Sequence, residues 1–403
     1  MALRSLIALL GVFLFLSSAI AQNNNERFLG RMKQDDANGD GKLTRSEFTG
    51  PDRLFKQLDS DGDGIVILKQ GAEKLHEIRV ERDGGVIGSS NQENAGNRMQ
   101  AAAGRSRGQV AGGAGRRLIE PDDQNVRYGE HERNVLDVYL AKTDSKDPAP
   151  CMIWIHGGGF RRGDKAEGSQ FAKSFTENGI HFVTLNYRLS QQAIAPACFH
   201  DCARAVQFIR HHAKKWNLDK TRIAVGGGSA GSGLSQWIGY SPDRADPDSE
   251  DPVLRESTRV SALILLNAQT SYDFRWIKQH VPGDAWQGDA LQQLFGYAIS
   301  NVGDITDAKY RLIEDCSPLT HFSKDDPPTL FFYRRSKDPS IAVKNAMDGI
   351  HHPIFGLELK KIADESGVPC EVFTVENEDD LAFYHRRWDY TMEFLRKHFH
   401  MSP

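Results

Sequence analysis

A serine between glycines is the first feature of this sequence that could carry chemistry. The segment Gly227-Gly228-Ser229-Ala230-Gly231 fits the pattern G-x-S-x-G and directly follows the strand-like run 223–225. A sharp strand-to-helix turn needs glycines beside its serine because the backbone is strained and crowded there, and such a turn exposes the hydroxyl above the sheet edge. The pattern predicts Ser229 as a nucleophile for acyl transfer. The alternative is an ordinary glycine-rich turn.

A second glycine-rich motif, His156-Gly157-Gly158-Gly159-Phe160, lies upstream and also follows an apolar run. Glycines at these positions let backbone N–H groups point into a site. We expect Gly158 and Gly159, together with the N–H of Ala230, to hold the oxyanion of a tetrahedral intermediate. We expect His156 to support this loop by hydrogen bonding rather than to act as a base. The two motifs in this order are far more specific than either alone.

These motifs resemble those of α/β-hydrolase esterases, in the branch that contains hormone-sensitive-lipase-like, acetylxylan and feruloyl esterases. The likeness extends over residues 126–400 and includes Asn186-Tyr187-Arg188-Leu189 and Asp201, near the start of the next predicted helix. The resemblance implies a mostly parallel sheet between helices and ester hydrolysis that needs no metal or other cofactor. It also implies that the substrate is a small ester or an esterified polysaccharide.

The resemblance places an acidic residue after the predicted strand 330–333. The family carries G-D-x-D-P there, and the stretch Arg335-Ser336-Lys337-Asp338-Pro339 keeps the second aspartate. Asp338 is therefore the candidate that would orient a histidine and support its positive charge. The alternative for Asp338 is a surface turn.

The histidine that the family carries after its last strand is missing here. Aligning Phe383-Tyr384 with the family's aromatic pair puts Leu381 in the histidine position, and leucine cannot accept a proton. Three interpretations remain open. His351 or His352 reaches the serine, or His385 does so through a shifted loop. Otherwise the site has no base, and the domain is a weak or inactive esterase that serves as a binding module.

Acidic residues near the amino terminus predict calcium sites. In an EF-hand loop, side chains at positions 1, 3 and 5 and a bidentate carboxylate at position 12 converge on the ion. Two segments follow this spacing: the first supplies Asp36, Asn38, Asp40, Glu47 and the carbonyl of Lys42, and the second supplies Asp59, Asp61, Asp63, Gln70 and the carbonyl of Ile65. Because Gln70 has one neutral oxygen where Glu47 has a carboxylate, we expect weaker binding in the second loop. An empty second loop and a plain Asp/Gly-rich turn are the alternatives.

Short apolar runs that alternate with helix-like segments predict the scaffold for these motifs. Strands are expected at 152–155, 181–185, 222–225, 262–266, 330–333 and 371–375, and helices at 169–178, 199–215, 231–240, 355–366 and 388–399. Several of the strands are apolar on successive residues, as strands covered on both faces require. This alternation predicts an α/β fold with a mostly parallel sheet. The EF-hand pair is expected to form a small all-α unit.

Composition changes along the chain predict its domain organisation. Residues 1–21 combine Arg4, an apolar run and Ala19-Ile20-Ala21, which is typical of a signal peptide; an uncleaved anchor is the alternative. We expect the EF-hand pair at 24–82, a flexible Gly/Ala/Arg linker at 83–118 and the hydrolase domain at 120–403.

The overall composition narrows the function further. Charged residues make up 26% and hydrophobic residues 39% of the 403 residues, a balance that excludes a wholly disordered chain. The net charge of −4 argues against nucleic acid as a partner, and the five cysteines are too few for a disulfide scaffold. We expect an exported protein, periplasmic or extracellular, with no membrane span after signal cleavage.

Overall fold

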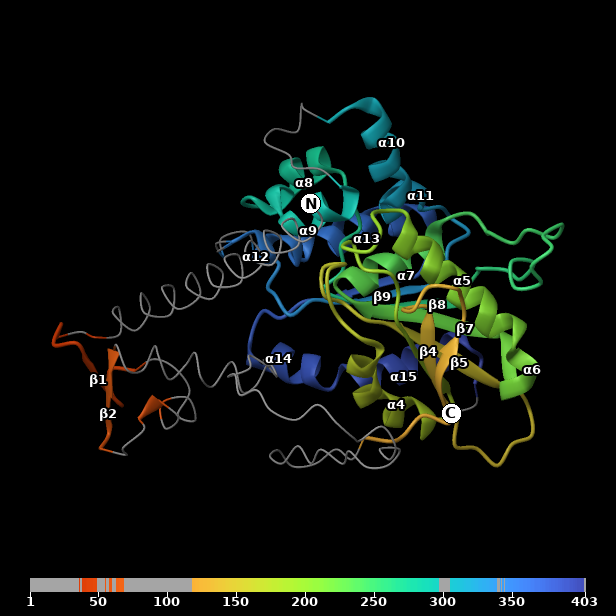
Figure 1. Cartoon of the computed structure of the whole chain (residues 1–403), viewed down its shortest axis with the longest axis horizontal. Coiled ribbons are helices and arrows are strands. Elements are labelled where there is room, and N and C mark those ends of the chain that lie inside the picture. The colour runs from red at the N-terminus through yellow and green to blue at the C-terminus, as the bar shows by residue number, and fades with distance from the viewer. Residues whose placement is uncertain are drawn as a thin grey trace, which may run out of the picture. The chain divides into compact units, whose positions relative to one another are not determined.

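The computed structural model describes two parts of the chain (Figure 1). The described residues are 36, 38–48, 55, 58, 59, 63–68, 118–296, 305–338, 341, 343 and 345–401. They belong to two compact units, residues 1–109 and 110–403. The predicted signal peptide at 1–21 and all of the predicted linker except Leu118 lie outside the described residues.

An eight-stranded sheet forms the centre of the larger unit. Its strands are β3 (Asp123–Arg127), β4 (Val135–Tyr139), β5 (Ala149–Ile155), β6 (His181–Leu185), β7 (Leu218–Gly228), β8 (Ala262–Leu266), β9 (Thr329–Phe332) and β10 (Cys370–Phe373). Their order across the sheet is β10-β9-β8-β7-β5-β6-β4-β3. Neighbours from β10 to β6 run parallel, whereas β4 is antiparallel to β6 and to β3. The prediction of a mostly parallel α/β sheet is confirmed.

The degree to which each strand is buried explains which strands could be predicted from the sequence. Every residue of β5, β6, β8 and β9 is buried, as expected for strands covered by helices on both faces. All the predicted strands are present. The strands β3 and β4 were not predicted, because polar residues interrupt their apolar pattern. One of these, Asp137, is buried in β4, where its carboxylate lies 2.6 Å from Nζ of Lys165.

Helices cover both faces of the sheet. They are α4 (Ser169–Thr176), α5 (Ala197–His211), α6 (Ala213–Trp216), α7 (Ala230–Tyr240), α8 (Phe274–His280), α9 (Asp289–Phe295), α10 (Asp307–Cys316), α11 (Pro318–His321), α12 (Ala346–Ile350), α13 (Ile354–Ser366), α14 (Glu378–His385) and α15 (Arg387–His398). Alternate residues of β5 define the two faces. Ile153 and Ile155 pack in the cluster that holds α5, α7 and α13, and Met152 and Trp154 pack with α4 and α15.

The predicted helices of the hydrolase domain are confirmed, but α14 and the helices between β8 and α13 were not predicted. The helices α8 to α11 precede β9 and α12 follows it; of these, α9 and α12 form part of the wall of the cavity beside Ser229. All five cysteines are buried and free. Within the described ranges, no helix is both long enough and apolar enough to cross a membrane.

The smaller unit contains a two-stranded antiparallel ribbon in a region that the sequence predicted as all helical. The strands β1 (Lys42–Thr44) and β2 (Ile65–Ile67) place Leu43 opposite Val66. Both side chains are buried in a small apolar cluster, together with Phe48, Phe55, Leu58 and Leu68. Leu43 and Val66 are the eighth residues of the two predicted calcium loops, counted from Asp36 and Asp59. The ribbon therefore joins the two loops at these positions.

Candidate active site

Ser229 occupies a strained turn between β7 and α7. Its backbone has φ 51° and ψ −116°, a conformation that a residue with a side chain rarely adopts. The Ser229 N–H donates a 2.8 Å hydrogen bond to the carbonyl of Leu266 in β8. A Cβ added to Gly227 would lie 2.5 Å from the carbonyl oxygen of Ile155, and one added to Gly231 would lie 2.1 Å from it. Both glycines of the G-x-S-x-G pattern are therefore required for space alone.

The second glycine motif lies directly against this turn. A Cβ added to Gly157 would lie 2.6 Å from the carbonyl oxygen of Gly228. Gly158 and Gly159 have φ values of 101° and 62°, which favour glycine. These two residues and Ala230, the predicted oxyanion residues, all line the pocket that contains Ser229.

His156 supports the oxyanion loop through a hydrogen bond to its backbone. Its Nδ1 lies 2.8 Å from the carbonyl oxygen of Gly157, and its Nε2 lies 3.2 Å from Nη2 of Arg133. A neutral ring with its proton on Nδ1 satisfies both contacts. Burial, with a smaller effect of Arg133, lowers the pKa of His156 to about 4, so the ring stays neutral. It stacks on Tyr187, which donates a hydrogen bond to the His156 carbonyl.

The other family-like residues form a rigid support behind this loop. The carboxylate of Asp201 is buried and accepts hydrogen bonds from the backbone N–H of Arg188 at 2.9 Å and from its guanidinium at 2.6 Å. Asn186 accepts a bond from the N–H of Lys165 and donates one to Asp164. These contacts connect the segment after β6 to the segment after the oxyanion loop.

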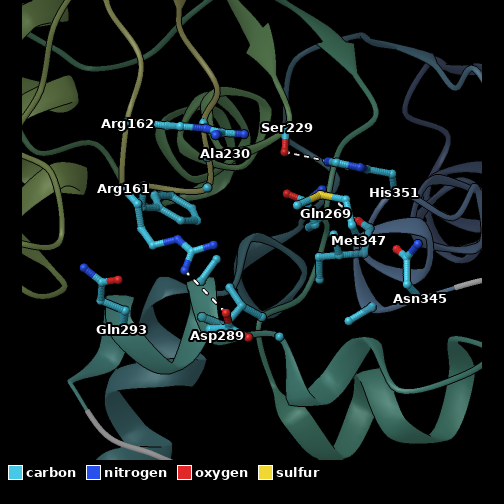
Figure 2. A pocket seen from close by; sticks show the side chains of 18 of the residues that line it. Arg161, Arg162, Ser229, Ala230, Gln269, Asp289, Gln293, Asn345, Met347 and His351 are labelled. Carbon is cyan, nitrogen blue, oxygen red and sulfur yellow. Dashed lines mark hydrogen bonds and ion pairs between the residues drawn. The ribbon is translucent and has the colours of Figure 1, made fainter. Parts of the chain in front are cut away.

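One of the candidate histidines lies next to the serine. Nε2 of His351 is 2.7 Å from Oγ of Ser229 (Figure 2). Burial lowers the pKa of the ring, whereas hydrogen bonding to the backbone of Met347 in α12 raises it. A ring that donates to this carbonyl from one nitrogen is free to accept the serine proton at the other. This histidine follows β9 and α12, whereas the family's histidine follows the last strand.

The surroundings of His351 keep it neutral. Burial is the largest cause that lowers its pKa; the charge of Arg335 lowers it further, and the charge of Asp348 raises it. Nη1 of Arg335 lies 3.0 Å from Oδ1 of Asp348, so the two charges offset each other in part. A base with a lowered pKa remains able to accept a proton in mildly acidic solution.

We expect the acid limb of the kcat/KM profile to lie below the pKa of an exposed histidine, because His351 must lose its proton to act and its pKa is lowered. Arg335→Met removes a positive charge and should move the limb to higher pH. Asp348→Asn removes a negative charge and should move it to lower pH. The measurement is kcat/KM for an uncharged ester across pH in the parent and both variants. A limb that stays in place in both variants would contradict this electrostatic account.

The other two candidate histidines are placed elsewhere. His352 is buried, and its Nδ1 accepts a 3.1 Å hydrogen bond from the N–H of Ile354 at the start of α13. His385 is exposed at the end of α14. Leu381, which occupies the family's histidine position, lies inside the same helix. The structure thus brings only His351, among these candidates, to the serine.

Asp338 is not brought to the His351 ring. It is exposed after β9, and its backbone N–H donates to Oγ of Ser336 at 2.9 Å. The charged groups that act on the His351 pKa are Arg335 and Asp348 instead. The family motif at 335–339 had pointed to Asp338 because its position in the sequence matches.

The serine and the histidine open into a cavity of about 770 Å³. Its remaining wall comes from segments that the sequence did not single out, and they include Arg161, Arg162, Gln191, Gln269, Asp289, Gln293, Asn345 and Met347. Helices α9 and α12 supply several of these residues. Arg161 and Arg162 directly follow the glycine loop in sequence, whereas the others reach the cavity through tertiary packing and no local pattern marks them.

Comparison with known proteins places this site in a family. Residues 136–348 match the BD-FAE family model, which is more than half of the chain. The probable carboxylic ester hydrolase LipM of Mycobacterium tuberculosis is 29% identical over 227 residues, covering 56% of this chain and 50% of that protein. The chain spans about half the length of this protein and of the esterase LipC of the same organism, which it also matches.

Two solved structures share the fold. A truncated carbohydrate esterase from gut microbiota gives a TM-score of 0.53 at 21% identity and covers 68% of this chain and 95% of its own. An acetyl ester-xyloside bifunctional hydrolase from Caldicellulosiruptor lactoaceticus gives 0.52 at 24% identity and covers 71% and 99%. The family match and this shared fold agree with the serine turn and the glycine-rich loop. The chain belongs to the BD-FAE family of hormone-sensitive-lipase-like α/β-hydrolase esterases.

Proposed function

We propose that this protein hydrolyses short acyl esters, acetyl or feruloyl groups on polysaccharide, through an acyl-enzyme on Ser229. The observation that carries the proposal is the 2.7 Å contact between Oγ of Ser229 and Nε2 of His351 beside the oxyanion loop. The relatives named as ester hydrolases and carbohydrate esterases support the substrate class.

The proposed reaction follows from this geometry. Oγ of Ser229 attacks the ester carbonyl while Nε2 of His351 accepts its proton, and the oxyanion takes hydrogen bonds from the backbone of the glycine loop and Ala230. The tetrahedral intermediate collapses, His351 returns the proton to the departing alcohol, and the acyl group remains on Ser229. A water molecule then attacks the acyl-enzyme with His351 again as the base, which releases the acid.

A second candidate function is that of a binding module with weak turnover. It is favoured by the absence of a carboxylate hydrogen bond to His351 among the described residues, since the ring instead bonds the backbone of Met347. A backbone carbonyl orients the ring but stabilises the imidazolium less than a carboxylate does. The two functions therefore differ in rate rather than in the architecture of the site.

A panel of acetylated xylan, methyl ferulate and 4-nitrophenyl acetate tests the proposal. We expect turnover of at least one of these esters, together with labelling of Ser229 by a serine-directed phosphonate. A folded protein that hydrolyses none of them and is not labelled would favour the binding module. Mass spectrometry of the digested protein identifies the labelled residue.

We also propose that the first predicted loop in the smaller unit binds calcium. Its donors are oxygen atoms, as calcium prefers. Oδ1 and Oδ2 of Asp36 each accept a 2.9 Å hydrogen bond from a backbone N–H of the loop, and Glu47 accepts one from the N–H of Thr44. Within the described residues the acidic side chains are not gathered into a metal cluster.

We expect the two calcium sites to differ in affinity. Glu47→Gln should weaken the tighter site about tenfold or more, because a bidentate carboxylate is lost at position 12. Gln70→Glu should strengthen the weaker site by a similar factor. Calorimetry on the full chain with each variant measures both effects, and equal sites in the parent would show that position 12 does not dominate. Esterase turnover should be nearly unchanged by chelator, since the proposed reaction uses no metal.

We propose further that the protein is exported, on the strength of the signal-peptide pattern at 1–21. Extracellular calcium is abundant enough to saturate modest sites, which would make the ion a constant structural element. Amino-terminal sequencing of the protein recovered outside the cytoplasm tests this. We expect the mature chain to begin at Gln22, and an intact chain that begins at Met1 and stays inside the cell would contradict it.

A further inference from the structure

The cavity beside Ser229 carries more positive than negative charge. Arg161 and Arg162 follow the oxyanion loop directly in sequence, and both line the cavity. Asp289 is the one acidic residue among the described lining residues. Its carboxylate lies 3.7 Å from Nη1 of Arg161, but the Asp289 side chain is 90% exposed. A pair so open to water is weak and neutralises Arg161 only in part.

Arg162 packs against the oxyanion loop. Its Cγ would be 3.0 Å from a Cβ added to Gly158, so the aliphatic part of the side chain packs against the glycine that is expected to face the substrate carbonyl. Its guanidinium end is directed toward the side of the cavity that holds Ser229 (Figure 2). In the part of the chain that the structure describes, Arg162 has no ion-pair partner.

Arg161 extends to the opposite wall, toward Asp289 at the start of α9 (Figure 2). A Cβ added to Gly159 would lie 3.3 Å from Cβ of Ala290, so α9 closes directly over the oxyanion loop. The two arginines therefore reach different parts of the cavity, Arg162 toward Ser229 and Arg161 toward α9 (Figure 2). The other polar lining residues are neutral amides, Gln191, Gln269, Gln293 and Asn345.

A guanidinium group pairs with a carboxylate through two parallel hydrogen bonds, and a cleft lined by one sign of charge concentrates ligands of the opposite sign. Given the proposed esterase function, we propose that this site takes esters that carry a carboxylate near the ester bond, such as acylated acidic sugars. Arg162 and Arg161 are the specificity-determining residues. Asp289 opposes this preference, because its carboxylate pairs with the guanidinium of Arg161.

Two matched pairs of esters test the proposal. Mono-4-nitrophenyl succinate against 4-nitrophenyl butyrate places the carboxylate on the acyl side, and 4-acetoxybenzoate against its methyl ester places it on the alcohol side. The readout is the ratio of kcat/KM for the anionic and the neutral member, after subtraction of the rate with Ser229→Ala protein. We expect a ratio above one in at least one pair, and a ratio that falls in high salt, since exposed charges are screened.

Substitutions then test which residues cause the preference for the anionic ester. In the preferred pair, Arg162→Gln and Arg161→Gln should each lower the ratio about fivefold or more, and Asp289→Asn should raise it. Arg255→Gln is the matched control, because this residue lies outside the cavity lining and its guanidinium bonds the carbonyl of Ser249. That variant should leave the ratio unchanged.

The failures of the inference and of the proposed function are distinguishable. Hydrolysis of the neutral esters without a preference in either pair, or with a ratio that Arg161→Gln and Arg162→Gln do not move, overturns the inference alone. A folded protein that hydrolyses no ester overturns the esterase proposal. In that case calorimetry with 4-hydroxybenzoate and its methyl ester still decides whether the cavity prefers a carboxylate, and equal binding of both overturns the inference as well.

Discussion

Ser229→Ala should lower kcat for ester hydrolysis by about 10⁴-fold or more, because the variant has no nucleophile to form an acyl-enzyme. The oxyanion loop and the cavity remain in this variant, so a small residual rate over water is expected. The measurement is steady-state hydrolysis of 4-nitrophenyl acetate, with phosphonate labelling of the parent and the variant. Full turnover in Ser229→Ala would show that the acyl-enzyme account is wrong.

Ser232 offers a matched control on the same helix. Its buried Oγ lies 2.6 Å from the carbonyl of Gly227 and accepts a 3.0 Å hydrogen bond from the N–H of Leu266. Ser232→Ala should therefore lower the free energy of unfolding by about 1–2 kcal/mol, the effect of losing buried hydrogen bonds. The folded variant should still be labelled at Ser229. If folded Ser232→Ala protein is not labelled, the assignment of Ser229 as the nucleophile is wrong.

The second large effect is expected at His351. His351→Ala should lower kcat by about 10³-fold or more, because Ser229 would then lack a base within hydrogen-bond distance. The serine should also react far more slowly with the phosphonate. Stopped-flow or steady-state hydrolysis of 4-nitrophenyl acetate measures the loss, and circular dichroism checks that the variant is folded.

The neighbouring histidines supply the controls for this experiment. His352→Asn keeps an acceptor for the N–H of Ile354 at the start of α13 and should retain turnover within a few fold. His385→Ala changes an exposed side chain and should leave turnover unchanged. If all three variants match the parent while Ser229→Ala is inactive, another group is the base. If the parent itself has no turnover, the binding-module interpretation is favoured.

Much of the fold was predictable because its signals are local. The apolar runs that form β5, β6, β8 and β9 are buried along their whole length, and a strand covered on both faces has no reason to alternate with polar residues. The strands β3 and β4, at one edge of the sheet, do not show this continuous apolar pattern. The strand β3 is largely exposed, and β4 contains the buried ion pair of Asp137 with Lys165, so neither was expected.

The serine turn and the glycine loop were predictable for the same reason. Their glycines are required by contacts within the motif or with the adjacent strand, such as the close approach of Gly231 to the carbonyl of Ile155. The glycines themselves lie close together in the chain, so the pattern is visible in the sequence even though β5 supplies part of the contact that requires it. The spacing of the predicted calcium ligands is local in the same sense, although Asp61 and Gln70 lie outside the described residues.

The sequence by itself determined the fold class, the candidate nucleophile and the oxyanion loop, because each depends on residues close together in the chain. It left three choices for the base, and only the tertiary structure placed His351, from 122 residues away, against Ser229. It pointed to Asp338, whereas the folded chain surrounds His351 with Met347, Arg335 and Asp348. The placement of α12 and of the segment after β9 decided these neighbours, and no local pattern encodes how two distant segments approach each other.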